Sequence, residues 1–125
     1  MSQSVNTPER TLVAGEDMST KKYYIVQLAA TGLIEVAEGA TDLIVGVLQN
    51  KPLAGEGALF RYGGSSKVVA AGVVAIGDFV TTDSAGKAVA TTTDGNVVIG
   101  RALEASATDG DIIEVQLSIQ HLYIA

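Results

Sequence analysis

Gly32-Leu33-Ile34-Glu35-Val36-Ala37 is matched 54 residues later by Gly86-Lys87-Ala88-Val89-Ala90-Thr91, and this pair of segments is the main indication of the architecture. Two further glycines, Gly46 and Gly100, are separated by the same interval (86 − 32 = 54 and 100 − 46 = 54). Periods of about this size are typical of duplicated supersecondary units. Chance similarity is the alternative, because glycine and valine recur in any all-β chain. The repeat predicts an all-β fold, a small β-barrel or β-sandwich with an internal pseudo-repeat.

Short strand-like segments separated by turns occupy the rest of the chain. They recur every eight to fourteen residues, which is typical of sandwiches and barrels. Short helices at 48–53 and 103–107 are alternatives, but each segment is too short to be favoured. The expected strands are 11–14, 21–28, 32–37, 43–48, 58–62, 67–75, 79–82, 87–91, 97–103 and 112–120.

Three local patterns are especially informative. Apolar and polar residues alternate over 112–120, which predicts a strand with one buried and one wet face. The apolar run 43–48 predicts a strand buried on both faces, and Gly46 within it indicates a bulge or a close backbone approach. Asp83-Ser84-Ala85-Gly86 has the residues of a type I turn, so a hairpin should join 79–82 to 87–91.

The chain is expected to form one domain. Its 125 residues can bury a core without staples, and no linker divides the body. Residues 1–10 are polar, lack periodicity and contain Pro8, so they predict a flexible or extended N-terminal arm. Residues 11–125 are expected to be a single β-domain.

Composition excludes several classes of function. The net charge of −6 argues against binding nucleic acid, whose phosphates favour a basic surface. No run of 18 apolar residues predicts a membrane span, and the N-terminal segment lacks the pattern of a signal peptide. Cysteine is absent, which excludes thiolate chemistry and fits folding in a reducing cytoplasm.

Candidate catalytic and metal-ligating residues are few. His121 is the only histidine, so a zinc site is not expected, and a triad of His121 with Ser118 and Asp111 would lack a nucleophile elbow. The acids lie in glycine-containing turns without the spacing of a calcium loop, which favours turn capping. No cofactor is expected. These acids are Glu16, Asp17, Glu56, Asp78 and Asp111.

Two lysine-containing turns allow other interpretations. Gly63-Gly64-Ser65-Ser66-Lys67 lacks the glycine spacing of a phosphate loop and precedes a strand, so we interpret it as a hairpin turn. Lys87 could be the modified lysine of a biotin or lipoyl carrier domain, which is also a small duplicated β-fold. However, Lys87 lacks the flanking residues of those carriers.

Four segments together carry a resemblance to a known family. They are 43–48, 77–88, 99–105 and 110–117, and their order resembles the small capsid cement, or head decoration, proteins of tailed bacteriophages. The resemblance covers roughly residues 11–120. Its motifs are structural turns and strands and not catalytic signatures.

This resemblance implies a structural role in a virion. Such proteins are small β-barrel-like domains, without enzymatic activity, that bind the outer surface of the phage head, often as homo-trimers. They stabilise contacts between subunits of the major capsid protein, and in related proteins an N-terminal arm becomes ordered on the capsid. The protein would be made in the cytoplasm of a host bacterium. The alternative is another virion component, such as a spike or fibre base that binds a receptor or glycan.

Two sets of candidate contact residues follow. An arm ahead of a compact body can fold on binding, by adding a strand to a sheet edge. Exposed aromatics and an apolar C-terminal tail favour self-association. The tail could instead cover the protein's own core. The expected capsid contacts are Val5, Pro8, Arg10, Leu12 and Val13, and the expected self-association residues are Tyr23, Tyr24, Tyr62, His121, Leu122, Tyr123 and Ile124.

Overall fold

A computed structural model describes residues 8–121, without the side chain of His121, and in this part of the chain it contains strands and no helix. All strand pairs are antiparallel, so the predicted all-β class is confirmed. The strands are β1 (Glu9–Val13), β2 (Ile25–Leu28), β3 (Ile34–Val36), β4 (Ile44–Leu48), β5 (Gly57–Arg61), β6 (Ser65–Val69), β7 (Phe79–Thr82), β8 (Ala88–Ala90), β9 (Val97–Ala102) and β10 (Ile112–His121).

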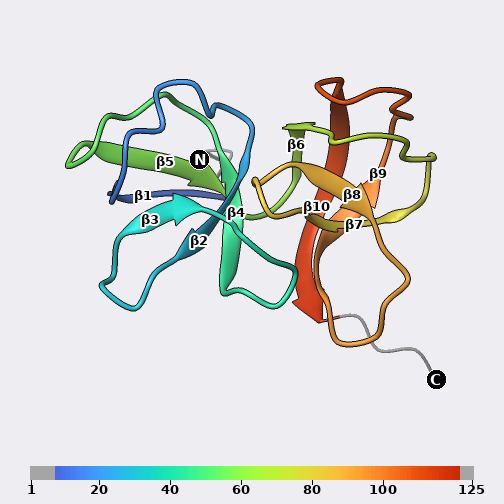
Figure 1. The fold of residues 1–125 in the computed structure, drawn as a ribbon, viewed down its shortest axis with the longest axis horizontal. Helices are drawn as coiled ribbons and strands as arrows, with labels where there is room; N and C mark the ends of the chain where they lie inside the picture. Colours follow the sequence, from blue (N-terminus) through green and yellow to red (C-terminus); the bar gives the residue numbers. More distant parts are fainter. Residues whose placement is uncertain (1–7, 122–125) are drawn as a thin grey trace, which may run out of the picture.

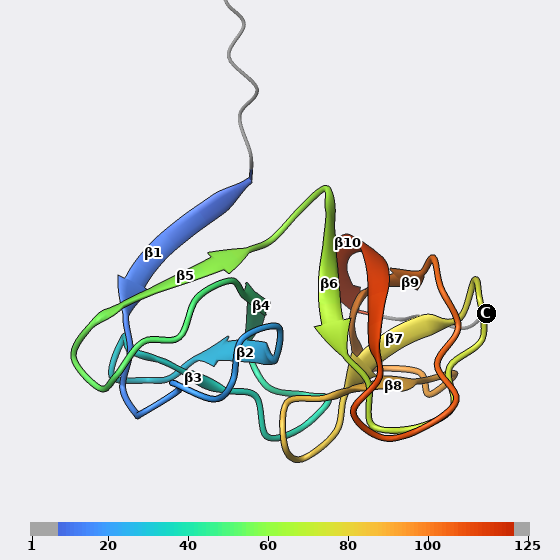
Figure 2. The same ribbon diagram turned by 90° about the horizontal axis from the view of Figure 1, so that it is seen from above.

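The strands form two five-stranded sheets with the same order. The first sheet is β1-β5-β4-β2-β3 and the second is β6-β10-β9-β7-β8, so adding five to each label of the first yields the second. We call residues 8–62 the first half and residues 63–121 the second half. Figures 1 and 2 show the two halves side by side. The predicted repeat is therefore a duplicated five-stranded unit.

Backbone hydrogen bonds repeat along with the strands. The amide of Ala37 donates to the carbonyl of Ile25 at 2.9 Å. The equivalent bond, in which both residues lie 54 positions later, runs from the amide of Thr91 to the carbonyl of Phe79, also at 2.9 Å. Elsewhere small insertions change the interval. Ala14 N–H donates to Glu56 O, whereas Ala70 N–H donates to Asp111 O, which gives intervals of 70 − 14 = 56 and 111 − 56 = 55.

The β7–β8 hairpin forms as its turn sequence predicts. One carboxylate oxygen of Asp83 accepts hydrogen bonds from the amides of Ala85 (2.8 Å) and Lys87 (2.9 Å). Gly86 has a φ of +80°, a conformation that glycine adopts without strain. Its counterpart Gly32, in the β2–β3 hairpin, has a φ of +82°.

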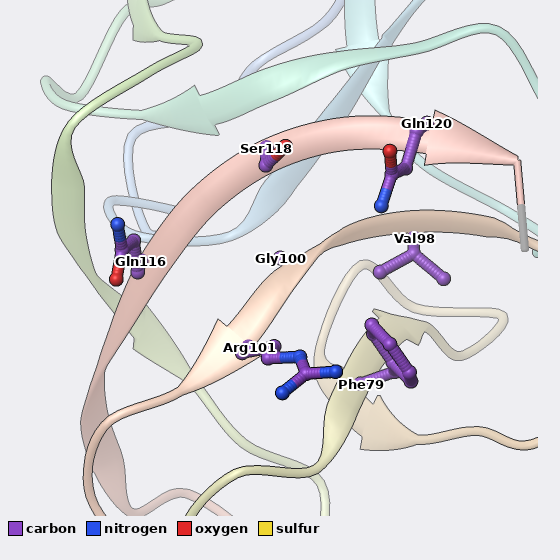
Figure 3. Close-up of a pocket in the computed structure, with 7 residues that line it drawn as sticks. All are labelled: Phe79, Val98, Gly100, Arg101, Gln116, Ser118 and Gln120. Atoms are coloured by element: carbon purple, nitrogen blue, oxygen red, sulfur yellow. The ribbon is translucent and has the colours of Figure 1, made fainter.

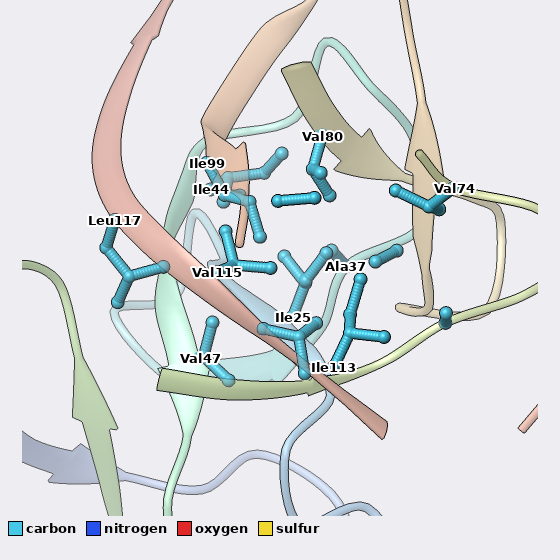
Figure 4. Close-up of a cluster of buried hydrophobic side chains, with 14 of the residues drawn as sticks. Ile25, Ala37, Ile44, Val47, Val74, Val80, Ile99, Ile113, Val115 and Leu117 are labelled. Carbon is cyan, nitrogen blue, oxygen red and sulfur yellow. The ribbon is translucent and has the colours of Figure 1, made fainter. Parts of the chain in front are cut away.

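Two clusters of buried side chains fill the protein. The first-half core belongs to one half alone and consists of Ala14, Met18, Val26, Ile34, Leu48, Ala58 and Phe60. The shared core combines side chains from both halves (Figure 4), with Ile25, Ala37, Ile44 and Val47 from the first half. Because β4 supplies Val47 to the shared core and Leu48 to the first-half core, it is buried on both faces, as predicted. From the second half the shared core takes Val68, Ala70, Val74, Val80, Ala88, Val97, Ile99, Ala102, Ile113, Val115 and Leu117.

Several strand limits differ from the expected ones. β2 begins at Ile25 and not at 21, because Tyr23 has a φ of +71°, which interrupts an extended strand. β6 covers 65–69 and not 67–75, since the chain leaves the sheet after Val69 to make the long connection to β7. β1 begins at Glu9, so the last residues of the expected arm are part of a sheet.

The described residues contain no helix long and apolar enough to cross a membrane.

Candidate functional site

The edge of the first sheet is formed by β1, which pairs on one side only, with β5. Tyr62 N–H donates to Pro8 O, and Ala14 N–H donates to Glu56 O, so even-numbered residues of this strand bond toward β5. In an antiparallel strand the backbone groups alternate in direction. The amides and carbonyls of Glu9 and Thr11 are therefore directed to the open edge.

A partly buried ion pair holds the start of β1 in place. Glu9 accepts hydrogen bonds from Nε (2.9 Å) and Nη2 (2.7 Å) of Arg61, both at the same carboxylate oxygen. Nη1 of Arg61 donates to the carbonyl of Ser65 at 2.8 Å, at the first residue of β6. Arg61 thereby ties the edge strand to the connection between the halves.

The predicted capsid-contact residues occupy different positions. Val5 lies outside the described residues. The carbonyl of Pro8 is bonded to Tyr62, and the side chain of Arg10 is exposed. Leu12 packs against the first-half core, whereas Val13 is exposed at the end of β1.

The predicted self-association residues also differ in their exposure. Tyr62 is exposed. Tyr23 and Tyr24 are half-buried and not fully exposed, and the ammonium groups of Lys22 and Lys21 lie 5.0 Å and 4.8 Å from their ring centres. The side chain of His121 and the whole of Leu122, Tyr123 and Ile124 lie outside the described part of the chain.

An open hollow of about 260 Å³ lies on the outer face of the second sheet. In Figure 3 Phe79 of β7 and Arg101 of β9 lie together at one side of it, with the guanidinium carbon 4.4 Å from the ring centre. Sequence reasoning missed this feature, although a phenylalanine and an arginine at strand positions were the available signal. Its other lining residues are Val98, Gly100, Gln116, Ser118 and Gln120.

Four of the five acids that could have suggested chemistry cap turns, as predicted, whereas Glu16 bonds to the distant strand β3. The carboxylate of Asp111 accepts hydrogen bonds from the amides of Ala107 (3.0 Å) and Thr108 (3.1 Å), which lower its pKa. Asp17, Glu56 and Asp78 accept from amides of Ser19, Leu53 and Ala75, and Glu16 accepts from Val36. No group of three metal-ligating side chains occurs among residues 8–121.

Lys87 is held in an ion pair. Its Nζ lies 3.0 Å from a carboxylate oxygen of Asp109, and this hydrogen bond raises the pKa of the lysine. The residue follows the hairpin turn and is anchored to the loop before β10.

Comparisons with known proteins agree with this architecture. The family model described as "Phage cement protein" matches residues 6–117. The crystal structure of the head fiber gp8.5 N base in bacteriophage phi29 is similar in fold, with a TM-score of 0.67 and 20% sequence identity. The similarity covers 93% of this chain and 98% of that chain. A search of curated proteins finds no match.

The family match spans nearly all of the strands and the connections between them. The resemblance noted in the sequence is thereby confirmed. This protein belongs to the phage cement protein family, and it is a capsid decoration component of a phage virion.

Proposed function

We propose that the protein binds the outside of the assembled head through the major capsid protein and holds neighbouring capsid subunits together, without catalysing a reaction. Its family of structural phage proteins supports this role. The net charge of −6 supports a position outside the shell, away from the packaged DNA phosphates. Each copy adds a modest contact, and the rigidity of the shell grows with the number of copies.

The observation that carries the capsid contact is the open edge of β1. Backbone groups of Glu9 and Thr11 are directed away from β5, and an extended segment of a partner protein can pair with this part of the edge. The exposed side chain of Arg10 lies on the same strand. We propose that the segment through Val5 and Pro8, together with Arg10, contacts the capsid, while Leu12 fixes the strand on the core.

We propose further that three copies associate on the capsid. Exposed apolar side chains on the first half, including Tyr62 and Val13, support self-association. The segment from His121 to Ile124 remains a candidate for the same contact. Its contribution is tested by a chain that ends at Gln120, whose sedimentation should show a weaker assembly than that of the full chain.

Cosedimentation with heads tests the capsid contact. Purified full-length protein is mixed with expanded heads that lack it, and bound protein is measured after pelleting. We expect saturable binding by the full chain and at least about tenfold weaker binding by a chain that begins at Glu9. The circular dichroism spectrum of the truncated chain checks that it is folded. Leu53→Ser, at an exposed loop residue, is the control and should bind like the parent.

Equal binding by the truncated and full chains would remove the N-terminal segment from the contact. No binding by either would contradict the capsid role itself. The intact mass of the protein from infected cells tests the carrier alternative at Lys87, and we expect the mass of the unmodified sequence.

A further inference from the structure

The two halves contact each other through different faces. Face A of the first half comprises Tyr23, Ile25, Ile44 and Val47, and face B of the second half comprises Val69, Gly86, Val97 and Leu117. The contact is marked by three backbone hydrogen bonds. They run from Val69 N–H to Tyr23 O (3.0 Å), from Ile25 N–H to Gly86 O (2.7 Å) and from Val97 N–H to Ala40 O (2.7 Å).

Five of these eight residues lie in the shared core, namely Ile25, Ile44, Val47, Val97 and Leu117. Figure 4 shows Ile25, Ile44 and Val47 in one cluster with Val115 and Leu117 of β10. Because the halves repeat one architecture, each half has both faces. Face A of the first half and face B of the second are covered within the chain, which leaves face B of the first half and face A of the second.

Face B of the first half is open and apolar. The repeat intervals make Val13 the counterpart of Val69 (69 − 56), Leu43 that of Val97 (97 − 54) and Tyr62 that of Leu117 (117 − 55). The exposed fractions of these pairs differ sharply: 47% against 9%, 64% against 7% and 48% against 6%. The first half therefore exposes side chains at the positions that the second half buries.

Face A of the second half is partly open and hollow, since Arg101 is exposed and Phe79 half-buried, whereas Val98 is buried. Phe79 stands at the position of Ile25, Val98 at that of Ile44 and Arg101 at that of Val47, each after 54 residues. These three residues line the hollow described above (Figure 3). At the covered contact Leu117 and Val47 belong to the same core cluster, so Tyr62, the counterpart of Leu117, is suited to enter the hollow beside Arg101.

We propose that copies of this chain associate head to tail, with face A of the second half of one copy docked on face B of the first half of the next. The contact repeats between chains the packing already present within one chain. Tyr62 enters the hollow and meets Phe79 and Arg101, where aromatic and cation–π contacts are available. The edge amide of Val13 is placed for the carbonyl of Gly77, which is the counterpart of the Val69–Tyr23 bond.

A contact between two different faces forms a ring when its rotation closes. Three copies would then present six halves in sequence, so the inference rests on the trimer proposed above and names its surfaces. The partner is a second copy of this chain, because the surface that would cover each open face is already present on the molecule. One contact between copies would therefore cover both open faces.

Two single variants test the arrangement. Tyr62→Arg places a positive charge opposite Arg101 and blocks face B, and Ser118→Arg fills the hollow and blocks face A. Both positions are exposed, so the fold should persist, which circular dichroism checks. If Ser118→Arg does not fold, Gln116→Lys at the same hollow replaces it. Analytical ultracentrifugation of the parent should give the mass of three chains, and each variant alone should be monomeric.

Mixing the two variants is the decisive step. Tyr62→Arg retains an intact hollow and Ser118→Arg retains an intact tyrosine, so an equimolar mixture should contain a two-chain species and nothing larger. Leu53→Arg and Ile112→Arg are controls, because both residues and their counterparts Thr108 and Gly57 are exposed. They should assemble like the parent.

Three results would overturn the proposal. The first is a parent that remains monomeric at about 1 mM, a concentration at which even a contact with a Kd near 1 mM becomes visible. The others are variants that assemble like the parent, or a mixture of the two variants that remains monomeric. Binding to heads is measured separately. Assembly without head binding would contradict the capsid role and leave the head-to-tail contact intact. Head binding by a monomer would support the capsid role and contradict the head-to-tail contact.

Discussion

Gly46 and Gly100 occupy the same position in the two halves, and each lies against a carbonyl of the neighbouring strand. A Cβ atom on Gly46 would overlap the carbonyl oxygen of Arg61, and one on Gly100 would overlap that of Gln116. The two acceptors are themselves equivalent, since 116 − 61 = 55. Close approach of the backbone therefore explains why both copies of the repeat keep glycine here.

We expect Gly46→Ala and Gly100→Ala each to lower the free energy of unfolding by about 1–3 kcal/mol, because the added methyl must displace backbone. Urea unfolding followed by circular dichroism measures both. Gly72→Ala is the control, since its Cβ would meet no atom within 4 Å. Equal stability of all three variants would contradict the close-approach explanation.

Ile25 and Phe79 are repeat counterparts in different surroundings. Ile25 is fully buried in the shared core, whereas Phe79 is only half-buried beside the hollow. Ile25→Ala should lower the free energy of unfolding by about 2–5 kcal/mol. Phe79→Ala should cost clearly less. A larger loss for Phe79→Ala in urea unfolding would show that the halves do not pack as described.

The ion pair of Glu9 and Arg61 should hold β1 weakly but measurably. Because both side chains are partly exposed, a double-mutant cycle should give a coupling energy of about 0.2–1 kcal/mol that falls with added salt. Arg61→Ala should destabilise more than Glu9→Ala, because it also removes the bond to the Ser65 carbonyl. Arg10→Ala, on the same strand, is the control and should have little effect. A larger effect of Glu9→Ala would place the anchor elsewhere.

Asp111 makes part of the stability dependent on pH. Backbone amides lower its pKa in the fold below the ordinary value of 3.8, so its charged form stabilises the protein above that value. This contribution is lost as the pH falls through the lowered pKa. Asp111→Asn should reduce the urea midpoint at pH 7, and the difference from the parent should shrink toward pH 2 or so.

Thr108→Ala is the matched control for Asp111, because it removes a single hydroxyl bond and keeps the carboxylate. At pH 7, Thr108→Ala should lower the urea midpoint by less than Asp111→Asn does. A difference between Asp111→Asn and the parent that stays constant with pH would contradict the role of the charge.

Local patterns predicted much of the fold. The turn at Asp83, the buried run through β4 and the alternation along β10 each depend on residues close in sequence, and all are observed. The repeat itself was visible because glycine is favoured at both Gly32 and Gly86, where φ is +82° and +80°.

Features that depend on how the halves pack could not be predicted in this way. Tyr23 adopts a positive φ where its carbonyl meets Val69 of the other half, so a strand pattern was interrupted by a distant contact. Likewise, the sequence does not distinguish the buried Val69 from the exposed Val13, because the two differ only in what covers them.

Cryo-electron microscopy of heads incubated with the protein shows directly whether β1 contacts the outside of the capsid. We predict added density on the outer surface of the shell, in which the open edge of β1 lies against the major capsid protein. Density on the inner surface, or decorated heads in which β1 faces away from the capsid, would contradict this prediction.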